Sequence, residues 1–180
     1  DHLAPHLLPE VLDAVPRAQI QIGPSDSLQD LYRRQADIAL RLTDPTQPDL
    51  IAQRIGEISF VLLATRAYLD RYGTPESPRD LLSHRLILPA DDRVVADVAR
   101  RAGLDPARLD IRLTSDDLRH RHALMKAGLG VGTGHHWMEK ADPALKRVLP
   151  GFTIDTVPVW LVATEDIRTS RVQRAVFDAL

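Results

Sequence analysis

The 180-residue sequence contains no cysteine, which excludes disulfide bonds, thiolate catalysis and metal sites built on cysteine. Because it also lacks an apolar run of membrane-spanning length, we expect neither a membrane span nor a signal peptide in this stretch. The net charge is only −2, and no basic face stands out, so this stretch is not expected to grip nucleic acid through its phosphates. With 44% hydrophobic and 27% charged residues, the composition predicts a globular chain of one large domain or two small lobes.

The most informative stretch runs from Asp110 to His136 and predicts a strand, a helix and a second strand. Apolar and polar residues alternate over 111–115, which is typical of a strand. Ser115 is expected to cap the helix, with acidic residues in its first turn, and Gly128 to end it. The helix start and the glycine-rich strand would face the side where open α/β sheets bind small ligands.

The rest of the chain predicts further strands that alternate with helices, which favours mainly parallel sheets. Predicted helices cover residues 3–15, 66–72, 79–83, 93–102, 137–140 and 168–180. Predicted strands or extended segments cover residues 20–22, 37–42, 50–55, 60–64, 86–88, 145–149 and 157–163. Ser25 or Asp26 is expected to cap one more helix, which carries Leu28, Leu31 and Tyr32. Because the chain starts on a helix with no strand before it, we expect Asp1 to be a cut point in a longer protein.

Two predicted ligand contacts lie at the start of the central helix. Ser115 and Asp116 could offer a cap hydroxyl and backbone N–H groups to a polar or anionic molecule. The alternative is an ordinary helix cap, and the adjacent acids would repel a carboxylate that came close.

The glycines at 128, 130, 132 and 134 follow a helix, so they do not match a nucleotide-binding fingerprint, whose glycines lie between a strand and the next helix. We interpret them as a close approach of the backbone to a ligand, with Thr133 and His135 pointing at it.

Further candidates follow the predicted strands. Arg41 and Thr43 lie at the carboxyl end of a buried strand, where Arg41 could bind a carboxylate as a bidentate fork. Pairing of Arg41 with Asp37 or Asp44 is equally compatible with the sequence. Thr65 could offer its hydroxyl to a ligand or cap the next helix.

Catalysis and metal binding find little support. His120 and His122 diverge on a helix, and His135 and His136 would point to opposite faces of a strand. No Gly-x-Ser-x-Gly elbow occurs, and Ser115 has no evident base partner. We therefore expect no enzyme, no metal site and no cofactor.

Several segments together resemble the effector-binding domain of LysR-type transcriptional regulators, over nearly the whole chain. In chain order they include Leu3-Ala-Pro-His-Leu-Leu-Pro, Gln35-Ala-Asp-Ile-Ala-Leu-Arg-Leu, Gln53-Arg-Ile-Gly-Glu, Lys126-Ala-Gly-Leu-Gly-Val-Gly and Pro158-Val-Trp-Leu-Val. Residues 89–109 and Gly132-Thr-Gly-His depart from the family pattern.

The resemblance implies an α/β, two-lobed fold like that of type 2 periplasmic binding proteins, with a central cleft and two crossovers. Lobe I would comprise residues 1–64 and 161–180, and lobe II residues 65–160. A winged helix-turn-helix and a first strand would precede this chain and supply the DNA contact. The implied protein is a cytoplasmic bacterial dimer or tetramer that senses a small metabolite, for which Arg41 suggests a carboxylate. The alternative, with the same fold, is a solute-binding protein of a transport system.

Overall fold

The computed structural model describes residues 4–23, 31, 33 and 35–180. The chain divides into two compact units: unit 1 holds residues 1–58 and 157–180, and unit 2 holds residues 59–156. The helix expected to begin at Ser25 or Asp26, with Leu28 and Tyr32, lies outside the described residues, although Leu31 is described and buried. Among the described residues, no helix is both long and apolar enough to cross a membrane.

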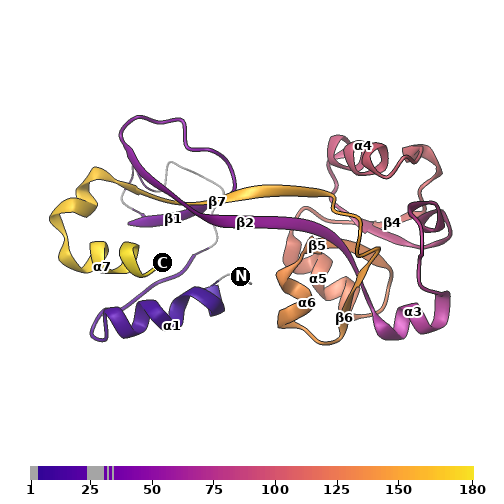
Figure 1. Cartoon of the computed structure of the whole chain (residues 1–180), viewed down its shortest axis with the longest axis horizontal. Helices are drawn as coiled ribbons and strands as arrows, with labels where there is room; N and C mark the ends of the chain where they lie inside the picture. The colour runs from indigo at the N-terminus through magenta and orange to yellow at the C-terminus, as the bar shows by residue number, and fades with distance from the viewer. Residues whose placement is uncertain (1–3, 24–30, 32, 34) are drawn as a thin grey trace. The chain divides into compact units, whose positions relative to one another are not determined.

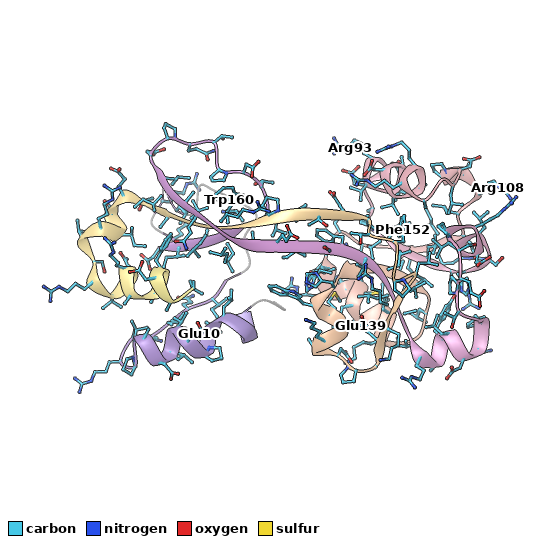
Figure 2. All side chains as sticks on the ribbon, in the orientation of Figure 1. Glu10, Arg93, Arg108, Glu139, Phe152 and Trp160 are labelled. Atoms are coloured by element: carbon cyan, nitrogen blue, oxygen red, sulfur yellow. The ribbon has the colours of Figure 1, made fainter. Side chains whose placement is uncertain are left out.

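Unit 1 combines helices α1 (Ala4–Ala14) and α7 (Arg171–Ala179) with strand β1 (Ile38–Arg41) and parts of β2 (Leu50–Thr65) and β7 (Asp155–Thr164) (Figure 1). A 3-10 helix, η3 (Glu165–Thr169), joins β7 to α7. Strands β1 and β7 pair antiparallel, with Arg41 opposite Trp160. The Trp160 indole, labelled in Figure 2, donates a hydrogen bond of 2.9 Å to Asp44. Helices α1 and α7 pack against each other.

Unit 2 is built on the strand order β6-β2-β5-β3-β4. The strands are β3 (Leu86–Leu88), β4 (Ile111–Thr114), β5 (Val131–His135) and β6 (Leu145–Val148), together with the end of β2. The helices are α3 (Arg66–Tyr72), α4 (Asp92–Arg101), α5 (Leu118–Lys126) and α6 (Trp137–Ala141), with 3-10 turns η1 (Pro78–Ser83) and η2 (Pro106–Arg108).

The sheet of unit 2 is buried on both faces, because successive side chains of a strand point to opposite sides. Leu62 and Ala64 of β2 belong to a core cluster that includes the apolar faces of α3 and α4. Val61 and Leu63 belong to another, which includes Met125 of α5 and Met138 of α6. Figure 1 likewise places α4 on one side of these strands and α5 and α6 on the other.

Two expectations from the sequence are wrong. Residues 20–22 form no strand, and Ile22 is 58% exposed, so the alternation there was too short to require a partner. The sheets are also not mainly parallel: β3 pairs parallel with β4 and β5, but β2 pairs antiparallel with β5 and β6, as β1 does with β7. Alternation of strands and helices fixes strand direction only where a single crossover joins two strands that are neighbours in the sheet. Strands β2 and β5 are neighbours in the sheet, but β3 and β4 lie between them in the chain.

Gly132 and Gly134 of β5 permit close packing of helices, which corrects our interpretation for these two glycines, that they approach a ligand. A Cβ on Gly132 would lie 2.5 Å from the Met125 sulfur, and one on Gly134 would lie 2.7 Å from the Met138 sulfur. These positions therefore face α5 and α6, and Thr133, between them, faces the other side of the sheet.

Buried His84 should make the stability of unit 2 depend on pH. It is 5% exposed, and its Nδ1 lies 3.3 Å from the Tyr68 hydroxyl. Burial lowers the pKa of His84, and the nearby Asp80 carboxylate opposes this only in part. The unfolded chain therefore takes up this proton first, and the free energy of unfolding should fall as the pH drops below about 6.5, the usual histidine pKa.

Urea unfolding between about pH 5 and 7 tests this expectation. His84→Gln should flatten the slope of stability against pH, whereas the exposed His120→Gln should leave it unchanged. Equal slopes for wild type and His84→Gln would contradict the assignment.

Candidate functional site

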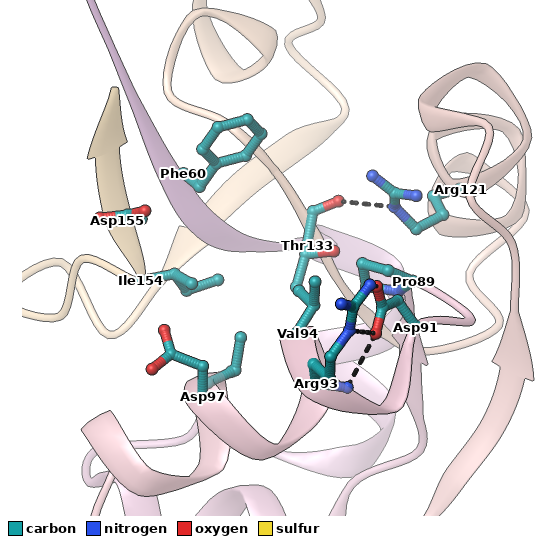
Figure 3. A pocket seen from close by; sticks show the side chains of 11 residues that line it. Phe60, Pro89, Asp91, Arg93, Val94, Asp97, Arg121, Thr133, Ile154 and Asp155 are labelled. Atoms are coloured by element: carbon teal, nitrogen blue, oxygen red, sulfur yellow. Dashed lines mark hydrogen bonds and ion pairs between the residues drawn. The ribbon is translucent and has the colours of Figure 1, made fainter. Parts of the chain in front are cut away.

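A pocket of about 500 Å³ opens entirely within unit 2. Its lining residues come from β2, the segment after β3, α4, α5, β5 and the start of β7, and Figure 3 shows them from close by. They are Phe60, Pro89, Asp91, Arg93, Val94, Asp97, Val98, Arg121, Thr133, Ile154 and Asp155. The volume suits a small organic molecule, and the mix of apolar surface with a few polar groups is typical of ligand sites.

Arg121 is the most unusual of these residues, because its charge is buried. It is 6% exposed and donates from Nε to the Thr133 carbonyl at 3.5 Å and from Nη1 to the Ser115 carbonyl. None of the carboxylates that the structure describes forms an ion pair with it. Burial lowers the pKa of Arg121, and Asp116 and Asp117 act in the opposite direction from a distance. A buried cation without a counter-ion favours binding of an anion.

Thr133 adds a buried hydroxyl without a hydrogen-bond partner among the described residues. Its side chain is 4% exposed, and its Oγ1 forms no hydrogen bond with any described residue. A buried hydroxyl left without a hydrogen bond costs about 1–3 kcal/mol, and a ligand acceptor in the pocket would remove that cost.

Replacing Thr133 with valine should therefore stabilise the ligand-free protein. Valine has nearly the same shape but no hydroxyl, and we expect the free energy of unfolding to rise by about 1 kcal/mol. Urea denaturation checks this, with Thr114→Val on the exposed side of β4 as the matched control. A loss of stability in Thr133→Val would contradict the absence of a partner for this hydroxyl.

The acidic residues of the pocket, in contrast, are paired with arginines. Asp91 caps α4 and binds Arg93 at 2.7 Å, which lowers the pKa of Asp91 to about 2. The exposed Arg93 extends from the start of α4 (Figure 2). Asp97 pairs with Arg100 and with Arg101, the latter at 2.7 Å. Arg101 also lies 3.5 Å from Asp155.

Ser115 and Asp116 are engaged within the protein. The Ser115 hydroxyl accepts the backbone N–H of Asp117 at 3.2 Å, and Asp116 accepts that of Ala90 at 2.9 Å. The cap of α5 is Asp117 rather than Ser115, since the Asp117 carboxylate accepts the Arg119 N–H at 2.7 Å. Neither Ser115 nor Asp116 lines the pocket by its side chain, although the Ser115 carbonyl holds Arg121.

The other predicted contacts are dispersed. Thr65 caps α3 by accepting the Tyr68 N–H at 3.3 Å. His135 is buried on β5, two residues beyond Thr133, and does not line the pocket. Arg41 ends β1 and Thr43 is exposed after it, both in unit 1. Of the seven predicted contacts, Thr133 alone lines the pocket of unit 2.

Arg121 was missed from the sequence, although a signal for it exists. It follows Leu118 by three residues and precedes Met125 by four, so a charged residue occupies the apolar face of a helix. The α4 wall was missed as well, and it belongs to the 89–109 stretch that departs from the family pattern. No cluster of three or more metal-ligating side chains occurs in the described ranges.

Strands and helices in two units, with a pocket of small-molecule size, define a ligand-binding domain of the two-lobed, periplasmic-binding-protein-like class. The chain belongs to the LysR substrate binding domain family, whose model matches residues 1–180. The fold class expected from the sequence is thereby confirmed.

Solved structures and curated relatives agree with this assignment. The regulatory domain of CrgA, a LysR-type transcriptional regulator from Neisseria meningitidis, superposes with a TM-score of 0.81 at 22% identity, over 98% of this chain and 89% of that one. The regulatory domain of AphB from Vibrio vulnificus gives 0.70 at 18% identity, over 99% and 90%. A probable HTH-type transcriptional regulator, LtrA of Klebsiella pneumoniae, is 37% identical over 82 residues, 43% of this chain. That match spans 26% of the relative, and the chain covers 63% of the longer CrgA structure.

Proposed function

We propose that this chain is the effector-sensing domain of a LysR-type transcriptional regulator and that its effector is a small carboxylate bound in the pocket of unit 2. The observation that carries the proposal is buried Arg121, which lines the pocket without an ion pair among the described residues. Guanidinium groups bind carboxylates through two parallel hydrogen bonds. The Thr133 hydroxyl adds a neutral donor beside it.

The family supports a regulator over a transport protein. In this proposal, units 1 and 2 are the two lobes, and the other predicted contacts, Arg41, Thr43, Thr65, Ser115, Asp116 and His135, remain candidates. DNA would be bound by a helix-turn-helix segment of the whole protein, which would act as a cytoplasmic dimer or tetramer. The effector can control DNA binding only if its affinity differs between two arrangements of the protein.

The test uses the full-length protein that contains this chain and the DNA fragments it binds in its own genome. Fluorescence anisotropy measures its affinity for one such fragment with and without a panel of small carboxylates. We expect at least one carboxylate to change the affinity by about fivefold or more, within the usual range of allosteric coupling. Thr133→Val should reduce this response without changing DNA affinity in the absence of ligand. Lack of DNA binding, or indifference to every carboxylate, would overturn the proposal.

A further inference from the structure

The pocket of unit 2 has opposite charges at its two ends. In Figure 3, Arg121 lies on one side together with the paired Asp91 and Arg93, and Asp97 and Asp155 lie on the other, with the side chains of Phe60 and Ile154 beside them. The apolar part also includes Pro89, Val94 and Val98. A ligand that reaches from Arg121 across the apolar surface therefore meets two carboxylates at the far side, whereas the charges of Asp91 and Arg93 are paired with each other.

We propose that the effector is a monoanion with one carboxylate on an apolar body, and that Asp97 and Asp155 exclude molecules with a second anionic group. This inference rests on the proposed function and names the chemical class that the same pocket selects. The chemical class of the effector is inferred from the polar atoms that can still bind a ligand at each end of the pocket.

At the cationic end, donors remain available. A guanidinium has five N–H donors, and two hydrogen bonds of Arg121 go to the carbonyls of Thr133 and Ser115. Those two bonds fix the plane of the group, so the remaining donors are oriented before the ligand arrives. The Thr133 hydroxyl, buried without a partner, supplies one more. One carboxylate satisfies this end.

At the acidic end, the pocket is lined by the carboxylates of Asp97 and Asp155, which offer acceptors and no donor. Asp97 is held by Arg100 and Arg101, and Asp155 by Arg101, but neither arginine lines the pocket. Hydrogen bonds from Arg100 and Arg101 lower the pKa of Asp97, so it stays charged at neutral pH. A second anionic group would lose its water here, meet like charge and find no donor. A methyl group at the same place carries no charge and forms no hydrogen bonds with water, so it would meet neither cost.

Three probes of matched shape test the proposal by NMR titration of the chain: 4-methylbenzoate, terephthalate and the neutral 4-methylbenzamide. The backbone amide signals of Thr133 and Val94 report whether a probe binds in the pocket. We expect 4-methylbenzoate to bind about tenfold or more tightly than either of the other probes. Terephthalate carries a second charge that meets the two aspartates, and 4-methylbenzamide lacks the charge that binds Arg121. Equal affinity for 4-methylbenzoate and terephthalate would overturn the inference.

Substitutions then assign the selectivity to its residues. Asp97→Asn with Asp155→Asn should reduce the preference for 4-methylbenzoate over terephthalate to about threefold or less. Asp155→Asn alone leaves the ion pairs within α4 intact. This single substitution should reduce the preference for 4-methylbenzoate by about twofold. Asp92→Asn removes the same charge from α4 outside the pocket lining and should leave the preference unchanged. A preference that persists in the double variant would also overturn the inference.

The failure of this inference can be told from the failure of the proposed function. If 4-methylbenzoate causes no shift at about 10 mM, a concentration far above the Kd of a specific site, the inference is wrong. A response of the full-length regulator to another carboxylate would still support the proposed function. If the probes bind as expected but no carboxylate changes DNA affinity, the proposed function is wrong and the pocket retains its assigned class.

Discussion

Gly130→Ala should lower the free energy of unfolding by about 3 kcal/mol, at the upper end of what overpacking costs. A Cβ at this position would lie 2.5 Å from the Arg85 carbonyl oxygen and 3.1 Å from its carbon. That oxygen also accepts the Val131 N–H at 2.9 Å. Because these are backbone atoms of the segment that enters β3, no side-chain rotation can relieve the clash, and the pairing of β3 with β5 must shift.

Urea denaturation measures the loss, and two other glycines calibrate it. Gly56→Ala meets no heavy atom within 4 Å, so its stability should stay within about 1 kcal/mol of wild type. Gly132→Ala meets the Met125 side chain, which can yield in part, and its effect should fall between the other two. If Gly130→Ala were as stable as Gly56→Ala, the close approach of Gly130 to Arg85 would be refuted.

Arg121→Gln should weaken carboxylate binding about 100-fold, the loss expected for one or two charged hydrogen bonds. Its stability without ligand should change by no more than about 1 kcal/mol, because removing a buried charge offsets the loss of two hydrogen bonds to carbonyls. NMR titration with 4-methylbenzoate measures the affinity, and urea unfolding measures the stability.

Arg119→Gln is the matched control for this change. Arg119 lies on the same helix, 58% exposed and paired with Asp117 at 2.7 Å, outside the pocket lining. The control loses the same formal charge as Arg121→Gln. Because this charge is exposed and lies outside the pocket, the affinity of Arg119→Gln for 4-methylbenzoate should remain within about twofold of wild type. Equal losses in the two variants would mean that general charge, and not contact with Arg121, governs binding. If Arg121→Gln failed to fold, Thr133→Val would test the same end of the pocket.

The elements that could be predicted from the sequence are those fixed by local pattern. Strand β4, helix α5 and strand β5 follow the predicted order, because the spacing of apolar residues changes from the period of a strand to that of a helix within the 27 residues from Asp110 to His136. Gly128 takes a positive φ of 70° at the end of the helix, as predicted. The cap was displaced from Ser115 to Asp117 because several capping residues stand in a row, and local pattern does not choose among them. Strand direction depends on contacts between distant segments, so the antiparallel pairs of β2 could not be read from the sequence.

The pocket was harder to predict than the fold because it joins segments that are distant in sequence. Its lining residues run from Phe60 to Asp155, and no local motif links them. Thr133 was found through the alternation of β5, which distinguishes its side from that of the glycines. The role of α4 could not be anticipated, although the helix itself was predicted, because only the packed structure brings its Val94 and Asp97 into the same pocket as Arg121.

The packing of glycine against methionine has a consequence for oxidation chemistry. The sequence holds no cysteine and two methionines, and both Met125 and Met138 are fully buried. On the side of these sulfur atoms that faces β5, Gly132 and Gly134 approach so closely that a sulfoxide oxygen has no room while the packing is intact. The folded chain therefore presents no sulfur to peroxides. An oxidant could therefore alter its sulfur atoms only after the fold has opened.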